Sequence, residues 1–432
     1  MRGSILLMPA KNKRRTLGIV VTLLCLSVGS ALSQTWTPTG APSNSWHCVA
    51  TSADGTKLAI GAYQTLGTVS GGPIYLSTDS GLSWTQAGVG TNKWSSLASS
   101  ADGTKLFAVA DDGNHASCRV IFSTNSGLDW GTNLMGGGGA VSPLPIIRCS
   151  ADGSKLVSTY YGVVWTSTNS GTTWISNSPP IEIWETPNWF SAACSADGNR
   201  LVVVKPAENL VYGSPFAPNL FISTNGGTSW LQFANLPAYG YLASSADGNT
   251  LAMAMNLGAN PHIFLSTNAG VSWETNNQPL YAGGIAVSAD GAKILASGYN
   301  GWIRSSTNSG VSWMTNDTVG ASPSAPNLGW AGAAMSADGT KWFLTSQSNS
   351  NTNSGRVYSW QTTPSTTVTV AKQNGLLLSW LIPSTNFVLQ QSFDFTSWSD
   401  VTNEPVLNFT SLQYQVTLQA PLDKAFYRLK TP

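Results

Sequence analysis

Five acidic residues in the variable stretches of this 432-residue chain are the first candidates for catalysis. A glycoside hydrolase needs two carboxyl groups roughly 5 to 10 Å apart, and a pair drawn from this group would supply them. The alternative is that all five are solvated loop acids, as most acidic side chains are. The five are Asp111, Asp112, Glu182, Glu185 and Glu208.

Aromatic residues form a second set of candidates, because they return at one place in a repeated pattern. They lie eight residues before the Asp of a recurring Ser-Ala-Asp-Gly phrase, and five of the seven copies have an aromatic residue there. Such rings could surround the mouth of a central channel, where flat faces stack on sugars without needing charge. The alternative is that they only pack one repeat against the next. The five are Trp46, Trp94, Trp189, Tyr239 and Trp330.

Other chemistries leave no trace in the sequence. His, Cys and carboxylate residues do not cluster at metal-ligand spacing, and neither a Gly-x-Ser-x-Gly elbow nor a phosphate-binding loop occurs. We therefore expect no metal and no cofactor. Charged residues make up only 9% of the chain and the formal net charge is +1, so no basic surface for nucleic acid is expected.

Two interleaved phrases define the elements that must position these candidates. The alanine turn, Ser-Ala-Asp-Gly, occurs seven times, with its Asp at 54, 102, 152, 197, 247, 290 and 338. The tryptophan turn, Ser-Thr-Asp/Asn-x-Gly-x-x-Trp, occurs six times, starting at Ser77, Ser123, Ser167, Ser223, Ser266 and Ser306. Repeats of roughly 40 to 50 residues with four short strands are typical of propeller blades. The sequence thus predicts an all-β, seven-bladed β-propeller.

Each phrase has the composition of a hairpin turn. Asp-Gly between two apolar strands supplies the positive φ that a tight hairpin needs. In the tryptophan turn, Asp79 is replaced by Asn in five of the six copies. A position that accepts either residue does not need a charge, so we interpret it as a structural staple. Function should then lie on the loop face, defined as the propeller face opposite both turns.

These phrases resemble the Asp-box, or bacterial neuraminidase repeat, over residues 36–361. The motif is found in sialidases, in polysaccharide-cleaving propellers and in photosystem II assembly propellers, and the resemblance implies the propeller fold. The sialidases also use an arginine triad and an Arg-Ile-Pro motif near the N-terminus. The motif is missing here, which argues against sialidase activity. The arginines within the repeats are Arg119, Arg148, Arg200, Arg304 and Arg356.

The two ends of the repeat region complement each other. Trp36 precedes Trp46 by the same ten residues that separate Trp84 from Trp94, while the seventh repeat ends near Gln361 without a tryptophan turn. We therefore expect the segment beginning at Trp36 to insert as the outer strand of the last blade, which removes an open sheet edge. Residues 362–432 lack the repeat and predict a small β module with strands at 376–382, 387–391, 413–418 and 426–429.

Residues 1–33 have the pattern of an export signal: a basic stretch up to Arg15, an apolar run from Leu17 to Val28, and small residues after it. We expect cleavage and an exported mature chain without a membrane span. Cys149 and Cys194 occupy equivalent places in successive repeats, so they either pair in an oxidising compartment or lie buried as small apolar residues.

These observations predict an exported, non-catalytic binding or assembly protein whose glycan or protein partner binds the loop face. The alternative is a glycoside hydrolase that uses carboxylates on the same face.

Overall fold

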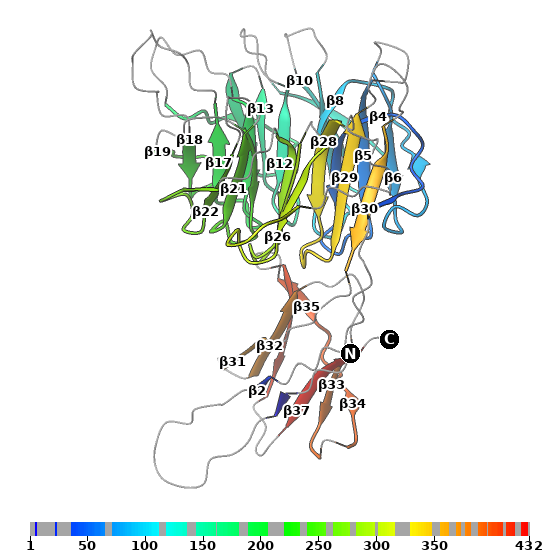
Figure 1. Ribbon diagram of the computed structural model, residues 1–432, viewed down its shortest axis with the longest axis vertical. Helices are drawn as coiled ribbons and strands as arrows, with labels where there is room; N and C mark the ends of the chain where they lie inside the picture. The colour runs from blue at the N-terminus through cyan, green and yellow to red at the C-terminus, as the bar shows by residue number, and fades with distance from the viewer. Residues whose placement is uncertain are drawn as a thin grey trace.

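The fold is known from a computed structural model. It describes residues 5–6, 22–23, 36–64, 71–111, 118–135, 144–160, 162–180, 189–205, 220–233, 240–255, 262–276, 282–298, 301–315, 329–347, 355–362, 369–372, 376–381, 388–394, 396–408, 412–419 and 425–430. Over these ranges the protein consists of strands and turns without a helix. Seven four-stranded antiparallel sheets form the broad body in Figure 1, with two further sheets beneath it. The prediction of a seven-bladed all-β propeller is confirmed.

The strands follow the chain in groups of four, from the innermost to the outermost of each blade. Blade 1 contains β4 (Ser45–Thr51), β5 (Leu58–Gln64), β6 (Ile74–Ser77) and β7 (Thr85–Gln86). Blade 2 contains β8 (Trp94–Ser99), β9 (Leu106–Ala110), β10 (Cys118–Ser123) and β11 (Gly131–Met135). Blade 3 contains β12 (Ile146–Cys149), β13 (Leu156–Tyr160), β14 (Val163–Ser167) and β15 (Ile175–Ser176).

The remaining blades repeat this order. Blade 4 contains β16 (Ser191–Cys194), β17 (Leu201–Val204), β18 (Leu220–Ser223) and β19 (Leu231–Phe233). Blade 5 contains β20 (Gly240–Ser244), β21 (Leu251–Met255), β22 (Ile263–Ser266) and β23 (Glu274–Asn276). Blade 6 contains β24 (Ala282–Val287), β25 (Ile294–Gly298), β26 (Ile303–Ser306) and β27 (Met314–Thr315). Blade 7 contains β28 (Gly329–Met335), β29 (Lys341–Gln347), β30 (Val357–Gln361) and, from the start of the chain, β3 (Thr37–Pro38).

Strand β3 closes the circle, as the sequence predicts. Thr37 pairs with Ser359 and Pro38 with Tyr358 of β30. The preceding Trp36 is 3% exposed and lies 6.3 Å from the Trp342 ring, measured between centroids. An N-terminal segment thereby covers the edge that blade 7 would otherwise leave unpaired.

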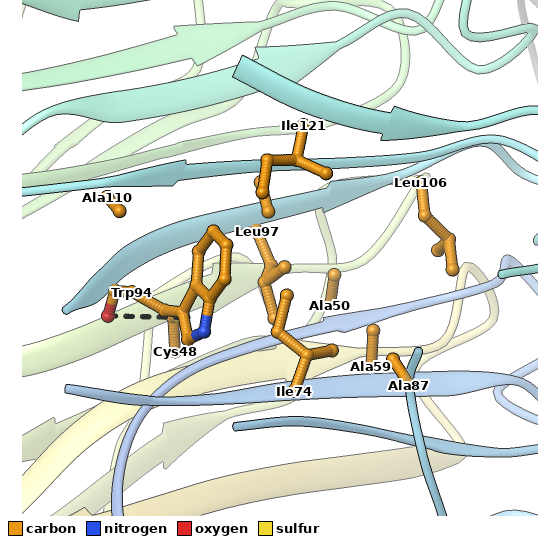
Figure 2. Packing of buried hydrophobic residues seen from close by; sticks show 11 residues of the cluster. Cys48, Ala50, Ala59, Ile74, Ala87, Trp94, Leu97, Leu106, Ala110 and Ile121 are labelled. Atoms are coloured by element: carbon orange, nitrogen blue, oxygen red, sulfur yellow. Dashed lines mark hydrogen bonds between the residues drawn. The ribbon is translucent and has the colours of Figure 1, made fainter. Parts of the chain in front are cut away.

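The hydrophobic core lies between neighbouring blades. The second strand of a blade is sandwiched between two sheets, so all five residues of β9 and of β21 are buried. Figure 2 shows one such layer, in which Trp94 and Leu97 of blade 2 meet Cys48 and Ile74 of blade 1. Apolar burial of this kind is the main stabilising contribution to a propeller, since each blade contacts its two neighbours.

The alanine turns join all seven blades into one hydrogen-bonded ring. The backbone N–H of each turn alanine donates to the carbonyl of the alanine in the next blade, from Ala53 to Ala101 and onward until Ala337 donates back to Ala53. All seven N···O distances lie between 2.7 and 3.0 Å. Because these backbone groups are satisfied by one another, this end of the channel is a closed and well-defined rim.

The strands after Gln361 form two small sheets. One contains β31 (Thr369–Lys372), β32 (Leu376–Leu381), β36 (Gln413–Leu418) and β35 (Val406–Asn408). The other contains β33 (Val388–Ser392), β34 (Ser399–Asp400) and β37 (Phe426–Lys430), with β1 (Ile5–Leu6) and β2 (Thr22–Leu23) on the edge at β37. The predicted strand positions of the module agree with β32, β33, β36 and β37. Apart from β1 and β2, the predicted export signal at 1–33 lies outside the described residues.

The C-terminal module contacts the propeller at the alanine turns. Leu407, Leu412 and Tyr414 of the β35–β36 hairpin pack against the ring of turn alanines. Figure 1 shows β35 at the upper end of the module, directly beneath the propeller. The module therefore covers the turn side of the central channel. Among the described residues, no helix has the length and apolarity that crossing a membrane requires.

Candidate functional site

A cavity of about 610 Å³ runs through the centre of the propeller. The first strands of all seven blades line it, from β4 through β28. Towards the alanine turns it is followed by a smaller cavity of about 180 Å³, which Leu412 of the C-terminal module borders. One residue of each blade borders both cavities: Thr51, Ser99, Cys149, Cys194, Ser244, Val287 and Met335.

Most of the channel wall is made of small, neutral side chains. Alanines, glycines and serines predominate, with Phe190 and Tyr241 as a larger aromatic pair whose ring centroids are 5.3 Å apart. His47 Nδ1 accepts a hydrogen bond from Gln347 Nε2 at 2.7 Å. Burial lowers the pKa of His47 to about 4, so its imidazole is neutral at neutral pH. Phe190, Tyr241 and His47 give this wall places for stacking and for hydrogen bonding.

Arg148 is the single charged residue among the described residues that line the large cavity. Its Nη1 donates to Ser96 Oγ at 3.1 Å and to the Ile147 carbonyl oxygen at 2.8 Å. Burial lowers the pKa of the guanidinium from its usual value, although a group of this type stays protonated in proteins. The side chain is only partly buried by neighbouring atoms because it faces the cavity. Arg148 therefore brings a fixed positive charge into the channel.

Three thiols line the same cavity as Arg148: Cys48, Cys149 and Cys194. All three are free, so Cys149 and Cys194 do not form the bridge that their repeat positions allowed. Cys149 Sγ bonds the Ser99 carbonyl oxygen at 3.2 Å and Cys194 Sγ that of Ser195 at 3.2 Å. Burial raises the pKa of Cys149 to about 12 and raises that of Cys194 as well. Such thiols are protonated and weakly nucleophilic at neutral pH.

The aromatic residues expected at the channel mouth lie inside the blades. Trp46, Trp94, Trp189 and Trp330 are each 0 to 1% exposed. A β-bulge follows Trp46, Trp94 and Trp330, where the first strand slips by one residue against the second. Their indole N–H groups donate to the carbonyls of Pro42, Gly72, Gly162 and Gly301, respectively.

This burial corrects the glycan-stacking prediction. The Trp46, Trp189 and Trp330 rings meet aromatic rings of the third strand of their own blades edge-on, at centroid distances of 5.7, 5.5 and 5.4 Å. With both faces covered and the N–H satisfied, these rings have no surface left for a sugar. Packing, the alternative interpretation, accounts for them. Tyr239 lies outside the described residues.

One of the five candidate carboxylates is described. Asp111 Oδ2 accepts a hydrogen bond from the Tyr63 hydroxyl at 2.8 Å. Burial, followed by this bond to Asp111, raises the pKa of Tyr63 to about 12. Asp112, Glu182, Glu185 and Glu208 lie outside the described residues, so the paired-carboxylate hypothesis stays a prediction. No group of three His, Cys, Asp or Glu side chains suited to a metal ion occurs in the described ranges.

The tryptophan turn has the geometry of a structural staple. In the fourth copy, Asn225 Oδ1 accepts from Ser223 Oγ and from the Ser229 N–H, both at 2.9 Å. The Asn225 amide then donates to Ser229 Oγ at 2.9 Å. In the first copy Asp79 makes the corresponding bonds, and those from Ser83 lower the pKa of its carboxyl group to about 2. Every polar atom of this side chain serves the turn.

Sequence inspection missed Arg148 as a site residue, although the repeats contain the signal. Four residues before the Asp of each alanine turn lie Ala50, Ala98, Arg148, Ala193, Ala243, Ala286 and Ala334. All seven line the large cavity. One blade thus presents a guanidinium where the other six present a methyl group. The position eight residues before the same Asp, which sequence inspection selected for its aromatic residues, lies in the core instead.

Comparison with known proteins identifies the fold. No protein-family model matches the chain, and no curated protein matches it in sequence. Among solved structures, YCF48 from Cyanidioschyzon merolae superposes with a TM-score of 0.54 at 11% identity, covering 76% of this chain and 98% of YCF48. A structure of YCF48 bound to D1 peptide gives 0.52 at 13% identity, covering 77% and 96%. The β-propeller domain of Cps50 (Swd1) from Myceliophteria thermophila gives 0.53 at 13% identity, covering 76% and 100%. At these identities the likeness concerns the propeller fold alone.

Proposed function

We propose that this protein is an exported, non-catalytic propeller of the Asp-box type that binds a segment of a partner polypeptide in its central channel, with entry from the loop face. The observation that carries the proposal is the 610 Å³ cavity, whose turn-side end is covered by Leu407, Leu412 and Tyr414. A cavity of this volume is in the range of specific ligand sites. Because the C-terminal module covers the opposite end, a ligand enters from the loop face.

A polypeptide suits this channel better than a glycan. Sugar sites rely on open aromatic faces, and the four described tryptophans that would supply them are buried. The wall offers instead apolar patches, hydroxyl groups and the Phe190–Tyr241 pair, which fit the mixed apolar and amide surface of a peptide. That a propeller of similar fold has been solved as YCF48 bound to D1 peptide supports a peptide as the class of ligand.

The export proposal rests on the N-terminal pattern, in which a basic stretch precedes a short apolar run. The test is N-terminal sequencing of the protein recovered from fractionated cells. A first residue between 30 and 36 in an exported fraction supports the proposal, and an intact Met1 in a cytoplasmic fraction contradicts it.

The binding proposal is tested by probing an immobilised library of 12-residue peptides and a panel of polysaccharides with the purified protein. We expect selective retention on a subset of peptides, with micromolar affinity in solution, and no hydrolysis of any polysaccharide. Binding restricted to polysaccharides, or release of reducing sugars, would contradict the proposal and favour the glycoside hydrolase alternative.

A further inference from the structure

The ring of seven equivalent residues around the channel has one exception that packing does not require. Six blades have alanine four residues before the turn Asp, and blade 3 has Arg148. Since six copies of the same blade fold with a methyl group there, the backbone has no need of a guanidinium. A residue that one blade has and the other six lack is not needed for the fold of a blade. Such exceptions are expected at functional sites.

The guanidinium is held in one orientation. Both N–H groups of Nη1 are used, one on Ser96 Oγ of blade 2 and one on the Ile147 carbonyl oxygen of its own strand. An arginine has five N–H donors, and those on Nε and Nη2 have no acceptor among the described residues. Neither nitrogen is one of the fully buried polar atoms that lack a partner. Both are therefore exposed to solvent in the cavity.

The charge of Arg148 has no counterion in the part of the channel that the structure describes. The described residues of the cavity wall include no Asp or Glu, and the thiols on that wall are protonated because burial raises the pKa of Cys48 and of Cys149 to about 12. A partly buried cation that lacks an acidic partner keeps an uncompensated part of its desolvation penalty. An anion that enters the channel would remove this penalty.

We propose that Arg148 forms a carboxylate-binding site in the central channel and that it recognises one carboxylate group of the polypeptide ligand. This inference rests on the proposed function for the source of the carboxylate. Nε and Nη2 lie on one edge of the guanidinium, the arrangement that pairs with both oxygens of a carboxylate. One fixed cation balances a monoanion, whereas a phosphate dianion would need a second cation that the described wall does not contain. Leu97, Ile146 and Phe190 line the same cavity, which thus offers apolar surface to the rest of a polypeptide ligand.

The test uses butyrate, which joins a carboxylate to a short apolar tail, together with its neutral isostere butyramide and inorganic phosphate. Binding to the purified protein is measured by titration calorimetry and ligand-observed NMR. Arg148→Ala is the decisive variant, because six blades already carry alanine at this place. Arg119→Ala is the matched control, since Arg119 lies on β10 and is exposed. We expect the parent and Arg119→Ala to bind butyrate at least tenfold more tightly than butyramide, and Arg148→Ala to lose that preference.

Location is tested separately from affinity, so a folding defect in one variant does not decide the outcome. Crystals of the parent soaked with 4-bromobutyrate should show the anomalous signal of bromine within the channel, near Arg148. Signal only elsewhere would overturn the proposal, as would equal affinity for butyrate and butyramide, tighter Arg148-dependent binding of phosphate, or full butyrate affinity in Arg148→Ala.

Peptides distinguish this inference from the proposed function. A peptide selected from the library is compared as its free acid, as its C-terminal amide, and with each Asp or Glu changed to Asn or Gln. Loss of affinity with one of these changes, abolished in Arg148→Ala, identifies the carboxylate as terminal or side-chain. Butyrate binding through Arg148 in a protein that binds no peptide would retain the carboxylate site and refute the polypeptide ligand. Peptide affinity that is unchanged by removal of each carboxylate and by Arg148→Ala would retain the polypeptide ligand and refute the carboxylate site.

Discussion

Replacing Trp36 by alanine tests how the propeller is closed. Trp36 is the large apolar residue that fixes the N-terminal segment, since the two residues of β3 are exposed. It is 3% exposed and lies 6.3 Å from Trp342 and 6.5 Å from Trp360, measured between ring centroids. Its Nε1 has no hydrogen-bond partner in the described structure, so the substitution removes packing contacts and leaves no hydrogen-bond acceptor without its donor.

The expected loss is about 3 to 5 kcal/mol of the free energy of unfolding, as for other buried aromatic residues changed to alanine. For a cooperative unit of roughly 330 residues this corresponds to a fall of about 4 to 7 °C in the melting midpoint. The assay is thermal unfolding followed by circular dichroism or calorimetry. Trp36→Phe should recover part of the loss, because a smaller ring still fills the site.

The matched control is Leu128→Ala, which removes an apolar side chain that is 82% exposed. Its midpoint should stay within about 1 °C of the parent, because exposed substitutions of this kind change stability by less than about 0.5 kcal/mol. Equal midpoints for the parent and Trp36→Ala would refute the reasoning, since the N-terminal strand would then contribute nothing to closure.

Three further predictions concern the turns, the channel and the module. Asn225→Ala should lower the free energy of unfolding by about 1 to 2 kcal/mol, because it loses turn hydrogen bonds. Asp79→Asn should leave the denaturation midpoint at pH 7 unchanged, because the other five copies of the turn carry Asn. Chemical denaturation measures both variants, and an Asp79→Asn protein as unstable as Asn225→Ala would show that the charge matters. The pKa of His47 in the folded protein is about 4, below its unfolded value, so the unfolded chain binds the proton first and the free energy of unfolding should fall as pH drops from about 6.5 to 4. His47→Gln should make the free energy of unfolding depend less steeply on pH over this range. The same pH dependence in both proteins would contradict the assignment. Leu412→Asp should separate the C-terminal module from the alanine ring and raise the rate of proteolytic cleavage between Gln361 and Thr369 at least tenfold. An unaltered cleavage rate would show that this contact does not fix the module to the propeller.

The repeated part of the fold was predictable from the sequence because every blade solves the same local problem. Asp-Gly and Ser-Thr-Asn turns fix hairpins by backbone geometry, so strand positions follow from the turn residues. Closure was predictable for the same reason, since Trp36 stands ten residues before Trp46 as Trp84 does before Trp94. The contact of Leu412 with the alanine ring was not, because it joins a non-repeated module to a surface through tertiary packing alone.

The site was harder to predict, because side-chain direction depends on details that repeat spacing does not encode. The β-bulges after Trp46, Trp94 and Trp330 place those rings in the core, so an aromatic residue at the start of an inner strand is no guide to the channel wall. Arg148 was visible as the exception among six alanines, but its meaning depends on knowing that this position lines the cavity. Four of the five candidate carboxylates lie outside the described residues, and their role stays a prediction.

The central claim, that the channel holds the ligand, is tested most directly by filling it. Ala243→Phe adds a ring at a channel position equivalent to that of Arg148, so the blade backbone has a precedent for a large side chain there. Val311→Phe adds the same ring on the outside, at a residue that is 85% exposed. The measurement is the solution affinity of one library-selected peptide for the parent and both variants, each with an unchanged melting midpoint. Channel binding predicts at least a tenfold loss in Ala243→Phe, equivalent to about 1.4 kcal/mol, and parental affinity in Val311→Phe. Parental affinity in Ala243→Phe would place the ligand elsewhere on the propeller and contradict the account.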